Sequence, residues 1–340
     1  MRAPGLSYAG AKVLLIEDDP QAIGLLQPLL VSKGFSVSTA RDGVEGLEKV
    51  QAVSPDIILC DVSMPRMDGL EVCRRLKNHP STRIIPVIML TAFSDLDKKL
   101  EALEAGADDF VNKPYNSIEL ITRLKSLIRV KYLNEQLDNA ENVLFTMARA
   151  IEAKDAYTQG HVERVSRLAV RLGQHLKIPE EDQDSLRKGG ILHDIGKIGV
   201  PDHILNKAGP LTPDERQIIQ LHPTQGAVIC EKLKTVRGAI PLIRHHHERI
   251  DGTGYPDHLA GQDIPLLARM LTIVDIYDAL TTTRSYRQRL PHQVAMEILW
   301  EEANRGWWDK EILREFEIMV GEGNGDILKD MHSSPTPVSS

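Results

Sequence analysis

Three carboxylates, a hydroxyl and an ammonium each follow a short apolar run in the first third of the chain. They are Glu17, Asp18, Asp61, Thr91 and Lys113. Carboxylates gathered in one small crevice repel one another unless a hard cation neutralises them, and oxygen ligands with retained water suit Mg²⁺. A hydroxyl and an ammonium beside them bind phosphoryl oxygens. This set therefore predicts a magnesium site that accepts a phosphoryl group.

A second set contains histidines and aspartates, and of the twelve histidines only His79 precedes residue 150. His193 and Asp194 are adjacent within an apolar segment, where burial is costly unless a partner such as a metal ion pairs with them. Other predicted ligands are His161, His222, His246, His247 and Asp275. One carboxylate can bridge two cations about 3.5 to 4 Å apart, as in hydrolytic two-metal sites. We expect Asp194 to be that bridge.

Alternating strands and helices must position the first set. Apolar runs predict strands at residues 13–16, 35–39, 57–60, 86–91 and 110–112, with amphipathic helices between them. This alternation predicts an α/β doubly wound, five-stranded parallel sheet of the flavodoxin-like type, whose ligands gather beyond the carboxyl ends of the strands. Asp19, Asp42 and Asp68 are predicted as helix N-caps, so Asp19 is not expected to bind the metal.

Residues 11–130 resemble the receiver domain of two-component response regulators. The motifs are Glu17-Asp18, Asp61-Val-Ser-Met-Pro65, Thr91-Ala92 and Lys113-Pro114. The resemblance implies that a sensor histidine kinase phosphorylates Asp61 and that the Lys113–Pro114 peptide is cis. The residues implied to serve this reaction are the Mg²⁺ ligands Glu17, Asp18 and Asp61, the phosphate contacts Thr91 and Lys113, and the aromatic switch Phe110.

Residues 131–150 are predicted to form a helical linker. Apolar residues spaced alternately three and four apart begin at Val130 and end at Ile151. Such heptads are typical of a parallel coiled coil, which would make the protein a homodimer through this helix. Packing of the same residues on a neighbouring domain is the equally weighted alternative.

Beyond the linker, residues 151–330 show helical patterns separated by Gly/Pro loops, which predicts an all-α domain, and residues 331–340 are predicted to be a disordered tail. This domain resembles the HD-GYP family within the HD superfamily, which are bacterial cyclic di-GMP phosphodiesterases. The motifs are His161-Val-Glu-Arg-Val165, His193-Asp194-Ile-Gly-Lys197, His222-Pro223, His246-His247-Glu248, Asp251-Gly-Thr-Gly-Tyr255-Pro256 and Asp275-Ile-Tyr-Asp278.

The HD-GYP resemblance implies two divalent metal ions. Its implied ligands are His161, His193, Asp194 and Asp275 for one ion, and Asp194, His222, His246 and His247 for the other. Mixed imidazole and carboxylate ligation favours Fe or Mn and leaves Zn or Ni open. Tyr157 stands where some members carry a glutamate for a third metal, so two metals are expected. His245 is interpreted as a neighbour of the ligands, and Glu248 as either a partner that orients an imidazole or an ordinary salt-bridge residue.

The implied reaction is hydrolysis of a phosphodiester of cyclic di-GMP by metal-activated water, to linear pGpG or to GMP. Lys197 is expected to offset charge on the phosphoryl oxygens. Expected substrate contacts are Gly254, Tyr255, Arg284 and Arg287. The general acid stays open between a metal-bound water and Asp278. A weakly active nucleotide-sensing module and a phosphodiesterase for another cyclic dinucleotide are the alternatives.

Composition limits the other functions. The chain has 340 residues and a net charge of −7, and no basic patch or helix-turn-helix follows the receiver-like segment, so DNA binding is not expected. No apolar stretch suits a membrane span and no signal peptide is apparent. The three cysteines lack paired spacing. A cytoplasmic protein without membrane insertion or disulfides is therefore predicted.

Overall fold

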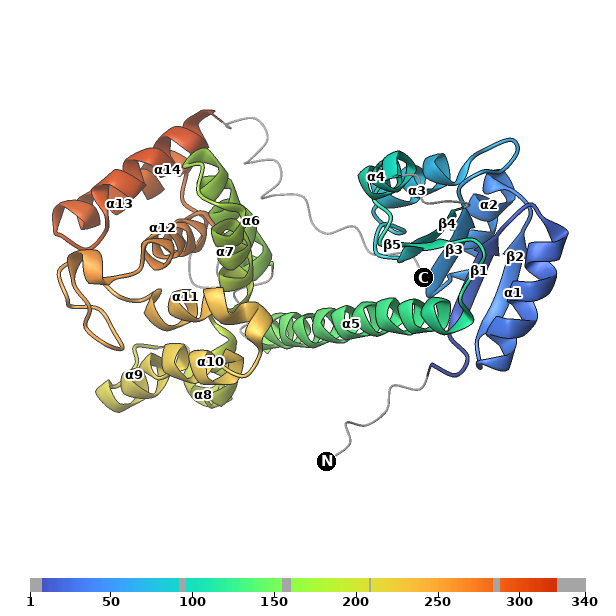
Figure 1. The fold of residues 1–340 in the computed structure, drawn as a ribbon. Coiled ribbons are helices and arrows are strands. Elements are labelled where there is room, and N and C mark those ends of the chain that lie inside the picture. Colours follow the sequence, from blue (N-terminus) through green and yellow to red (C-terminus); the bar gives the residue numbers. More distant parts are fainter. Residues whose placement is uncertain (1–7, 92–95, 155–159, 208, 284–287, 323–340) are drawn as a thin grey trace. The chain divides into compact units, whose positions relative to one another are not determined.

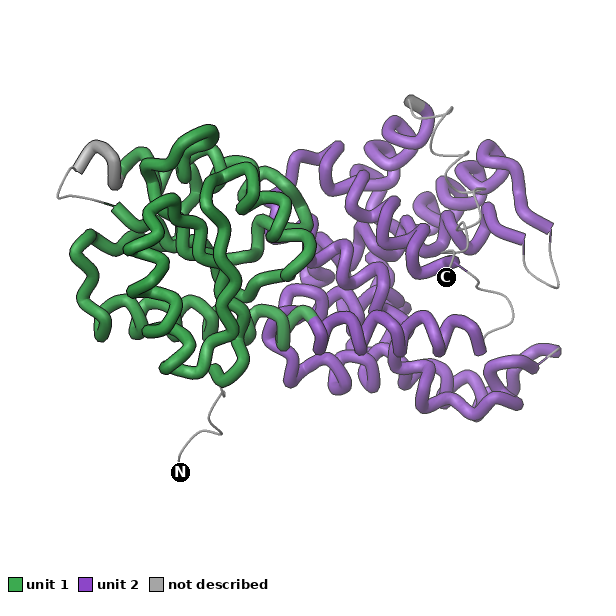
Figure 2. Tube along the Cα trace, turned by 90° about the vertical axis from the view of Figure 1, so that its right-hand side faces the viewer, with its two compact units in different colours: residues 1–138 green, residues 139–340 purple. Residues whose placement is uncertain are grey.

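A computed structural model describes residues 8–91, 96–154, 160–207, 209–283 and 288–322 of the chain. These residues divide into two compact units, 1–138 and 139–340, coloured separately in Figure 2. The division falls inside the predicted linker of residues 131–150. None of the described helices is long and apolar enough to cross a membrane.

The first unit is built on a five-stranded parallel sheet in the order β2-β1-β3-β4-β5. The strands are β1 (Lys12–Ile16), β2 (Ser36–Ala40), β3 (Ile57–Asp61), β4 (Val87–Thr91) and β5 (Asp109–Asn112). All five predicted strands are confirmed to within one residue. The chain reverses direction across the sheet between β1 and β3, and the carboxyl ends of these two strands flank the crevice where such sheets bind ligands.

Helices cover both faces of this sheet (Figure 1). One face carries α1 (Pro20–Ser32) and the first part of α5 (Ser117–Lys154), and the other carries α2 (Gly43–Val53), α3 (Gly69–Asn78) and α4 (Leu96–Glu104). Alternate strand residues enter the two cores, with Leu14 in one and Leu15 in the other. The predicted caps are confirmed, since the carboxylates of Asp19, Asp42 and Asp68 accept hydrogen bonds from the first turns of α1, α2 and α3.

Helix α5 contains the boundary between the units, and its apolar residues fall into different surroundings. Leu120 and Leu124 are buried against the sheet, and Ile151 is buried in a core of the second unit. Val130, Leu133 and Leu137 are exposed by 51%, 43% and 43%. The predicted seam therefore packs within a unit at its end near Ile151 and is exposed over the two turns that follow Val130.

The described part of the second unit is helical apart from one isolated bridge, Asp251 to Ala260. Its elements are α6 (His161–His175), α7 (Glu180–Leu192), η1 (Ile195–Gly199), α8 (Asp202–Leu205), α9 (Pro213–Gln220), α10 (His222–Cys230), η2 (Lys234–Ala239), α11 (Ile240–His245), η3 (Gly261–Asp263), α12 (Leu266–Thr281), α13 (His292–Asn304) and α14 (Lys310–Glu322). The all-α expectation is confirmed for these residues. The predicted tail, residues 331–340, lies outside the described residues.

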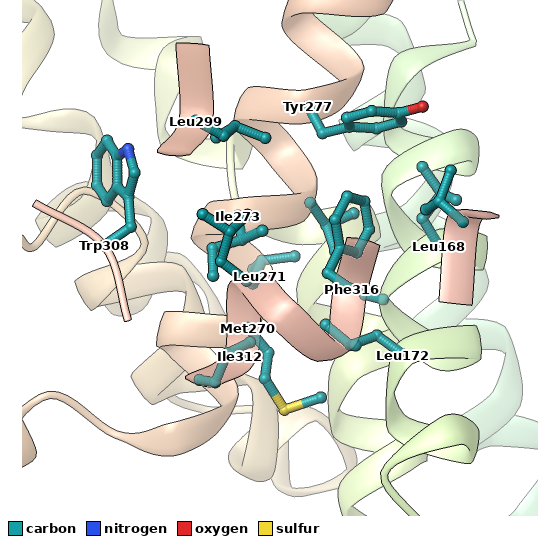
Figure 3. Packing of buried hydrophobic residues seen from close by; sticks show 14 of the residues in the cluster. Leu168, Leu172, Met270, Leu271, Ile273, Tyr277, Leu299, Trp308, Ile312 and Phe316 are labelled. Carbon is teal, nitrogen blue, oxygen red and sulfur yellow. The ribbon is translucent and has the colours of Figure 1, made fainter. Parts of the chain in front are cut away.

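Helix α12 runs through the centre of the second unit. Its residues are apolar on several sides, and Leu271, Ile273 and Tyr277 pack against α6, α13 and α14 in the core drawn in Figure 3. A helix that is apolar nearly all round is stable only when other elements surround it. The two acidic residues of α12, Asp275 and Asp278, are three residues apart and lie on one side of the helix, next to the first residue of α6.

Candidate functional site

The first unit brings its predicted carboxylates together at the carboxyl ends of β1 and β3. Oxygen atoms of Glu17, Asp18 and Asp61 lie within 4.8 Å of one another, with Asp18 exposed and the other two buried. The Nζ of Lys113 lies 2.7 Å from Glu17 Oε2 and 3.1 Å from Asp61 Oδ2. Three oxygen donors around one opening are a suitable ligand set for Mg²⁺.

One lysine does not fully offset the burial of these carboxylates. Burial raises the pKa of Glu17 and of Asp61 even though Lys113 acts to lower both. For Lys113, burial acts to lower the pKa, but the hydrogen bond to Glu17 and the charge of Asp61 raise it. The crevice therefore favours an additional cation, which agrees with a magnesium site.

The remaining predicted receiver residues line the same edge of the sheet. Thr91 is buried at the end of β4, and Phe110 on β5 is partly buried against the core beneath α2, α3 and α4. The Lys113–Pro114 peptide is cis, as expected. The structure therefore places every predicted phosphate-site residue at the carboxyl-end edge or on the strand beside it.

The second unit gathers its predicted metal ligands from α6, α10 and α12 and from the residues that directly follow α7 and α11. Two groups of ligand atoms share Asp194: one contains His161 and His193, and the other contains His222, His246 and His247. Asp275 Oδ1 lies 3.1 Å from His161 Nε2 and 3.8 Å from His193 Nε2, which adds it to the first group. Asp194 is therefore shared by two adjacent groups of potential metal ligands.

Three of these histidines are oriented in the same way by the backbone of the preceding helical turn. His193, His222 and His246 each place Nδ1 2.7 to 2.9 Å from the backbone carbonyl three residues earlier. The carbonyl oxygens belong to Gly190, Ile219 and Ile243. A carbonyl only accepts hydrogen bonds, so each Nδ1 carries the proton and each Nε2 presents a lone pair. Second partners of this kind are typical of metal-bound imidazoles.

His161 is oriented by a side chain instead of a backbone carbonyl. Its Nδ1 lies 2.7 Å from Asp278 Oδ2, and the carboxylate of Asp278 also accepts hydrogen bonds of 2.7 and 3.0 Å from the guanidinium of Arg164. Burial acts to raise the pKa of Asp278, but the bonds from His161 and Arg164 outweigh it and lower the pKa. Asp278 is fully buried and ionised, which suits it to orient His161 rather than to supply a proton to substrate.

Unpaired polar atoms at the centre of this cluster fit a metal centre. Within the described structure, His193 Nε2 and Asp194 Oδ1 are buried and have no hydrogen-bond partner. Leaving such atoms unpaired is costly, and metal coordination would satisfy both. The donor set of imidazole nitrogens and carboxylate oxygens suits a divalent transition metal.

The protonation states are also those of ligands. Burial lowers the pKa of His246 well below its usual range and that of His247 to about 3, so both imidazoles are neutral. For Asp194 and Asp275, burial acts to raise the pKa. Lys197 and two histidines lower it for Asp194, two histidines lower it for Asp275, and both carboxylates stay ionised. Metal binding needs neutral imidazole and ionised carboxylate, which these groups supply.

Close backbone contacts hold the ligand-bearing segments together. A Cβ on Gly196 would lie 1.9 Å from the carbonyl oxygen of His222, so only glycine lets η1 approach the start of α10. A Cβ on Gly254 would lie 2.4 Å from the Cα of Glu248. Glu248 is buried and its Oε1 accepts a hydrogen bond from the backbone of Asp257, so it fixes the loop after the His246-His247 pair.

The expected substrate contacts fall partly within the described structure. Tyr255 stacks on His247 with ring centres 4.7 Å apart, and Lys197 Nζ lies 2.6 Å from Asp194 Oδ2. Arg284 and Arg287 lie outside the described residues, as does Tyr157. His245 points to Asp257, 3.0 Å away, and does not join the metal groups found among the described residues.

Two features of this site were not foreseen from the sequence. Arg164 follows His161 by three residues and binds the same carboxylate, and the i−3 carbonyls orient the other histidines. The helical spacing of His161 and Arg164 was a usable signal for the first feature, since residues three apart share a helix face. The carbonyl partners had no side-chain signal, because any residue type carries the same carbonyl.

Comparison with known proteins identifies both units. Residues 13–125 match the model of the response regulator receiver domain, and residues 146–312 match that of the HD domain. The chain is 33% identical over 320 residues to the cyclic di-GMP phosphodiesterase response regulator RpfG of Xanthomonas campestris pv. campestris, covering 87% of this chain and 84% of that protein. It is 31% identical to a cyclic di-GMP phosphodiesterase of Thermotoga maritima, with 83% of each covered. A 3′3′-cGAMP-specific phosphodiesterase of Vibrio cholerae is 38% identical over 167 residues, which cover 48% of this chain and 36% of that protein.

Proposed function

The chain belongs to the family of response regulators that join a receiver domain to an HD domain, and on that basis we propose that it is a cyclic di-GMP phosphodiesterase with a binuclear metal site, controlled by phosphorylation of Asp61. The observation that carries the proposal is the common orientation of four histidines around Asp194. In each of them Nδ1 is held by a carbonyl or carboxylate and Nε2 faces the centre. Relatives that align with 83% and 87% of this chain are cyclic di-GMP phosphodiesterases.

Two divalent ions at this site would supply Lewis acidity and lower the pKa of water that attacks the phosphodiester. The protein residues would prepare the site for them. Asp194 would hold both ions, and Asp278 would orient His161 through Nδ1. Lys197, beside Asp194, would offset charge that develops on the phosphoryl oxygens. Tyr255 and the backbone of Gly254 would form one wall of the substrate site.

We propose Fe or Mn as the resident metals and Mg²⁺ as the cation of the receiver. The second unit offers mainly imidazole nitrogen, which suits borderline transition metals, whereas the receiver offers only oxygen. Anaerobic purification followed by elemental analysis tests the assignment of Fe or Mn to the HD site. Two equivalents of Fe or Mn per chain are expected, and binding of a single equivalent after metal loading would contradict a binuclear site.

Hydrolysis of cyclic di-GMP by the metal-loaded protein tests the activity, with His193→Ala and Asp194→Ala as site variants. Both variants should lose turnover, because the first removes a ligand and the second removes the bridge. Chromatography of the products distinguishes pGpG from GMP. Undiminished hydrolysis by both variants would overturn the site assignment. Single-turnover measurement separates a slow enzyme from a module that only binds nucleotide.

A second substrate class is favoured by one observation, the similarity of the HD unit to a 3′3′-cGAMP-specific phosphodiesterase. A panel of cyclic di-GMP, 3′3′-cGAMP and cyclic di-AMP compares the substrates by kcat/KM. If kcat/KM is highest for 3′3′-cGAMP, then 3′3′-cGAMP and not cyclic di-GMP is the preferred substrate.

Phosphorylation by a sensor histidine kinase is proposed to change turnover through helix α5. The position of Asp61 beside Lys113 and the two other carboxylates supports this role. Treatment with a small phosphodonor should alter turnover of the wild type and leave Asp61→Asn unaffected. Equal turnover of the two proteins, after phosphorylation of the wild type has been verified, would refute this control.

A second copy of the chain is the proposed partner of the exposed stretch of α5. Val130, Leu133 and Leu137 are spaced three and four residues apart, so they form one stripe on the helix. Light scattering should give a dimer for the wild type and a monomer for the double variant Leu133→Lys, Leu137→Lys. A monomeric wild type at micromolar concentration would exclude this homodimer.

A further inference from the structure

A cavity of about 310 Å³ is lined by His247 and by none of the other predicted metal ligands. Its size is at the lower end of the range of ligand pockets, roughly 300 to 1,000 Å³. A cyclic dinucleotide contains two nucleotide halves, and a cavity of this size matches one of them. The half that occupies it would lie next to the phosphodiester held at the metal centre.

The lining of this cavity combines cationic donors with a flat apolar wall. Arg216 and Gln220 come from α9, Arg249 and Tyr255 come from the loop after α11, and Trp308 and Ile276 add apolar surface. No carboxylate is among the described lining residues, although the whole chain has a net charge of −7. The cavity therefore attracts electron-rich acceptor groups rather than cations.

The two arginines differ in how they are held. The guanidinium of Arg249 lies 3.8 Å from the ring centre of Trp307, which fixes its plane by stacking. Arg216 is exposed and forms no ion pair with any residue of the described structure. An arginine without a carboxylate partner, in the lining of a cavity that also includes His247, keeps its N–H fork available for a ligand.

We propose that this cavity is a guanine subsite of the enzyme, in which Arg216 reads the O6 and N7 edge of the base. The proposal rests on the proposed function and names what determines its substrate specificity. Guanine presents two acceptors, O6 and N7, that match the fork of an arginine, whereas adenine presents an N6 donor beside N7. Gln220 adds an amide that both donates and accepts, and Trp308 with Ile276 gives the flat base an apolar surface. If the second phosphate of the cyclic dinucleotide occupied this cavity instead, a positive charge alone would be enough to bind it, and the fork of an arginine would not be required.

Kinetics with three substrates test the assignment: cyclic di-GMP, cyclic di-AMP and bis(p-nitrophenyl) phosphate, which has no base. Arg216→Ala should lower kcat/KM for cyclic di-GMP by at least about tenfold more than for bis(p-nitrophenyl) phosphate, because one bidentate contact is lost. The loss should appear mainly in KM. Arg237→Ala, which removes an exposed arginine outside the cavity, should behave as the wild type. Equal loss on the two substrates would overturn the subsite.

The variant Arg216→Lys separates base recognition from charge. Lysine keeps the positive charge and loses the fork, so the preference for cyclic di-GMP over cyclic di-AMP should fall by about tenfold. A lysine variant with the full wild-type preference would show that Arg216 acts as a charge, and would overturn the guanine assignment.

Binding of GMP and AMP to the metal-loaded protein tests the subsite without turnover. Calorimetry should show tighter binding of GMP than of AMP, and Arg216→Ala should remove the difference. This measurement separates the guanine subsite from the proposed phosphodiesterase activity. If the protein prefers GMP in this way but does not hydrolyse cyclic di-GMP, the activity is refuted and the subsite is supported. Equal affinity of the wild type for GMP and AMP would overturn the subsite alone.

Discussion

The receiver site and the HD site both surround carboxylates with potential metal ligands, and they do so by different means. The receiver takes three oxygen donors from the ends of two neighbouring strands and leaves Asp18 exposed. The HD site encloses Asp194 among four buried histidines whose rings are fixed by carbonyls or by Asp278. Open oxygen sites exchange Mg²⁺ with water, whereas fixed imidazoles retain a transition metal. Preorganisation therefore distinguishes a signalling site from a hydrolytic one.

The largest expected effect compares two adjacent histidines of the HD unit. His246→Ala removes an Nε2 ligand that faces the cluster and should lower turnover by at least about 10³-fold, since a metal ion contributes several kcal/mol to such reactions. His245→Ala, which removes a contact with Asp257 and no ligand of the metal groups, should stay within about threefold of the wild type. Steady-state hydrolysis of cyclic di-GMP measures both, and comparable losses would contradict the orientation argument.

The next effect concerns the partner that fixes His161. Asp278→Asn should weaken metal binding or activity by about 10- to 100-fold, because the hydrogen bond that orients the imidazole changes. Competition with a metal-sensitive dye measures the affinity, and the number of bound ions is counted separately. Asp184→Asn, at a half-exposed carboxylate paired with Arg187, is the matched control. If the Asp278→Asn protein bound metal with normal affinity, the orientation of His161 by this carboxylate would not contribute to metal binding.

The stability of the metal-free HD unit and its affinity for metal should both depend on pH. Burial acts to lower the pKa of His161, but hydrogen bonds to Asp275 and Asp278 raise it from 6.5 to about 10. The bound proton thus stabilises the metal-free fold below pH 6.5, and this contribution is lost as the pH rises from 6.5 to 10. Metal ligation needs neutral His161, so affinity should rise about tenfold per pH unit in that window. Calorimetry of metal binding at pH 7.5, in buffers of different ionisation enthalpy, should show that about one proton is released per protein. If no proton is released, His161 is not protonated in the metal-free protein.

The smallest effect belongs to the open receiver site. Asp18→Asn should weaken Mg²⁺ binding by about fivefold to tenfold, because an exposed charge contributes little in water. Asp19→Asn is the matched control, since that carboxylate caps α1 and accepts a hydrogen bond from Gln21. It should leave Mg²⁺ affinity unchanged and lower the free energy of unfolding by about 1 kcal/mol or less. Equal Mg²⁺ affinity of the wild type and Asp18→Asn would remove Asp18 from the site.

The sequence by itself determined the strands, the three aspartate caps and the ligand types. Strand alternation and N-cap chemistry are local, so the segment around Asp19 already contains the information. The identities of His193 and Asp194 were also readable, because adjacent polar residues in an apolar helix need a partner.

Only the tertiary structure decided which groups orient those ligands and where a cavity lies beside them. The pairing of Asp278 with His161 and Arg164 joins residues 114 to 117 positions apart, and no local pattern states which carboxylate will reach which ring. The cavity that ends at Arg216 likewise depends on how α9 packs beside the loop of Tyr255. Local propensity acts over one or two helical turns, whereas ring orientation and cavity shape arise where distant helices meet.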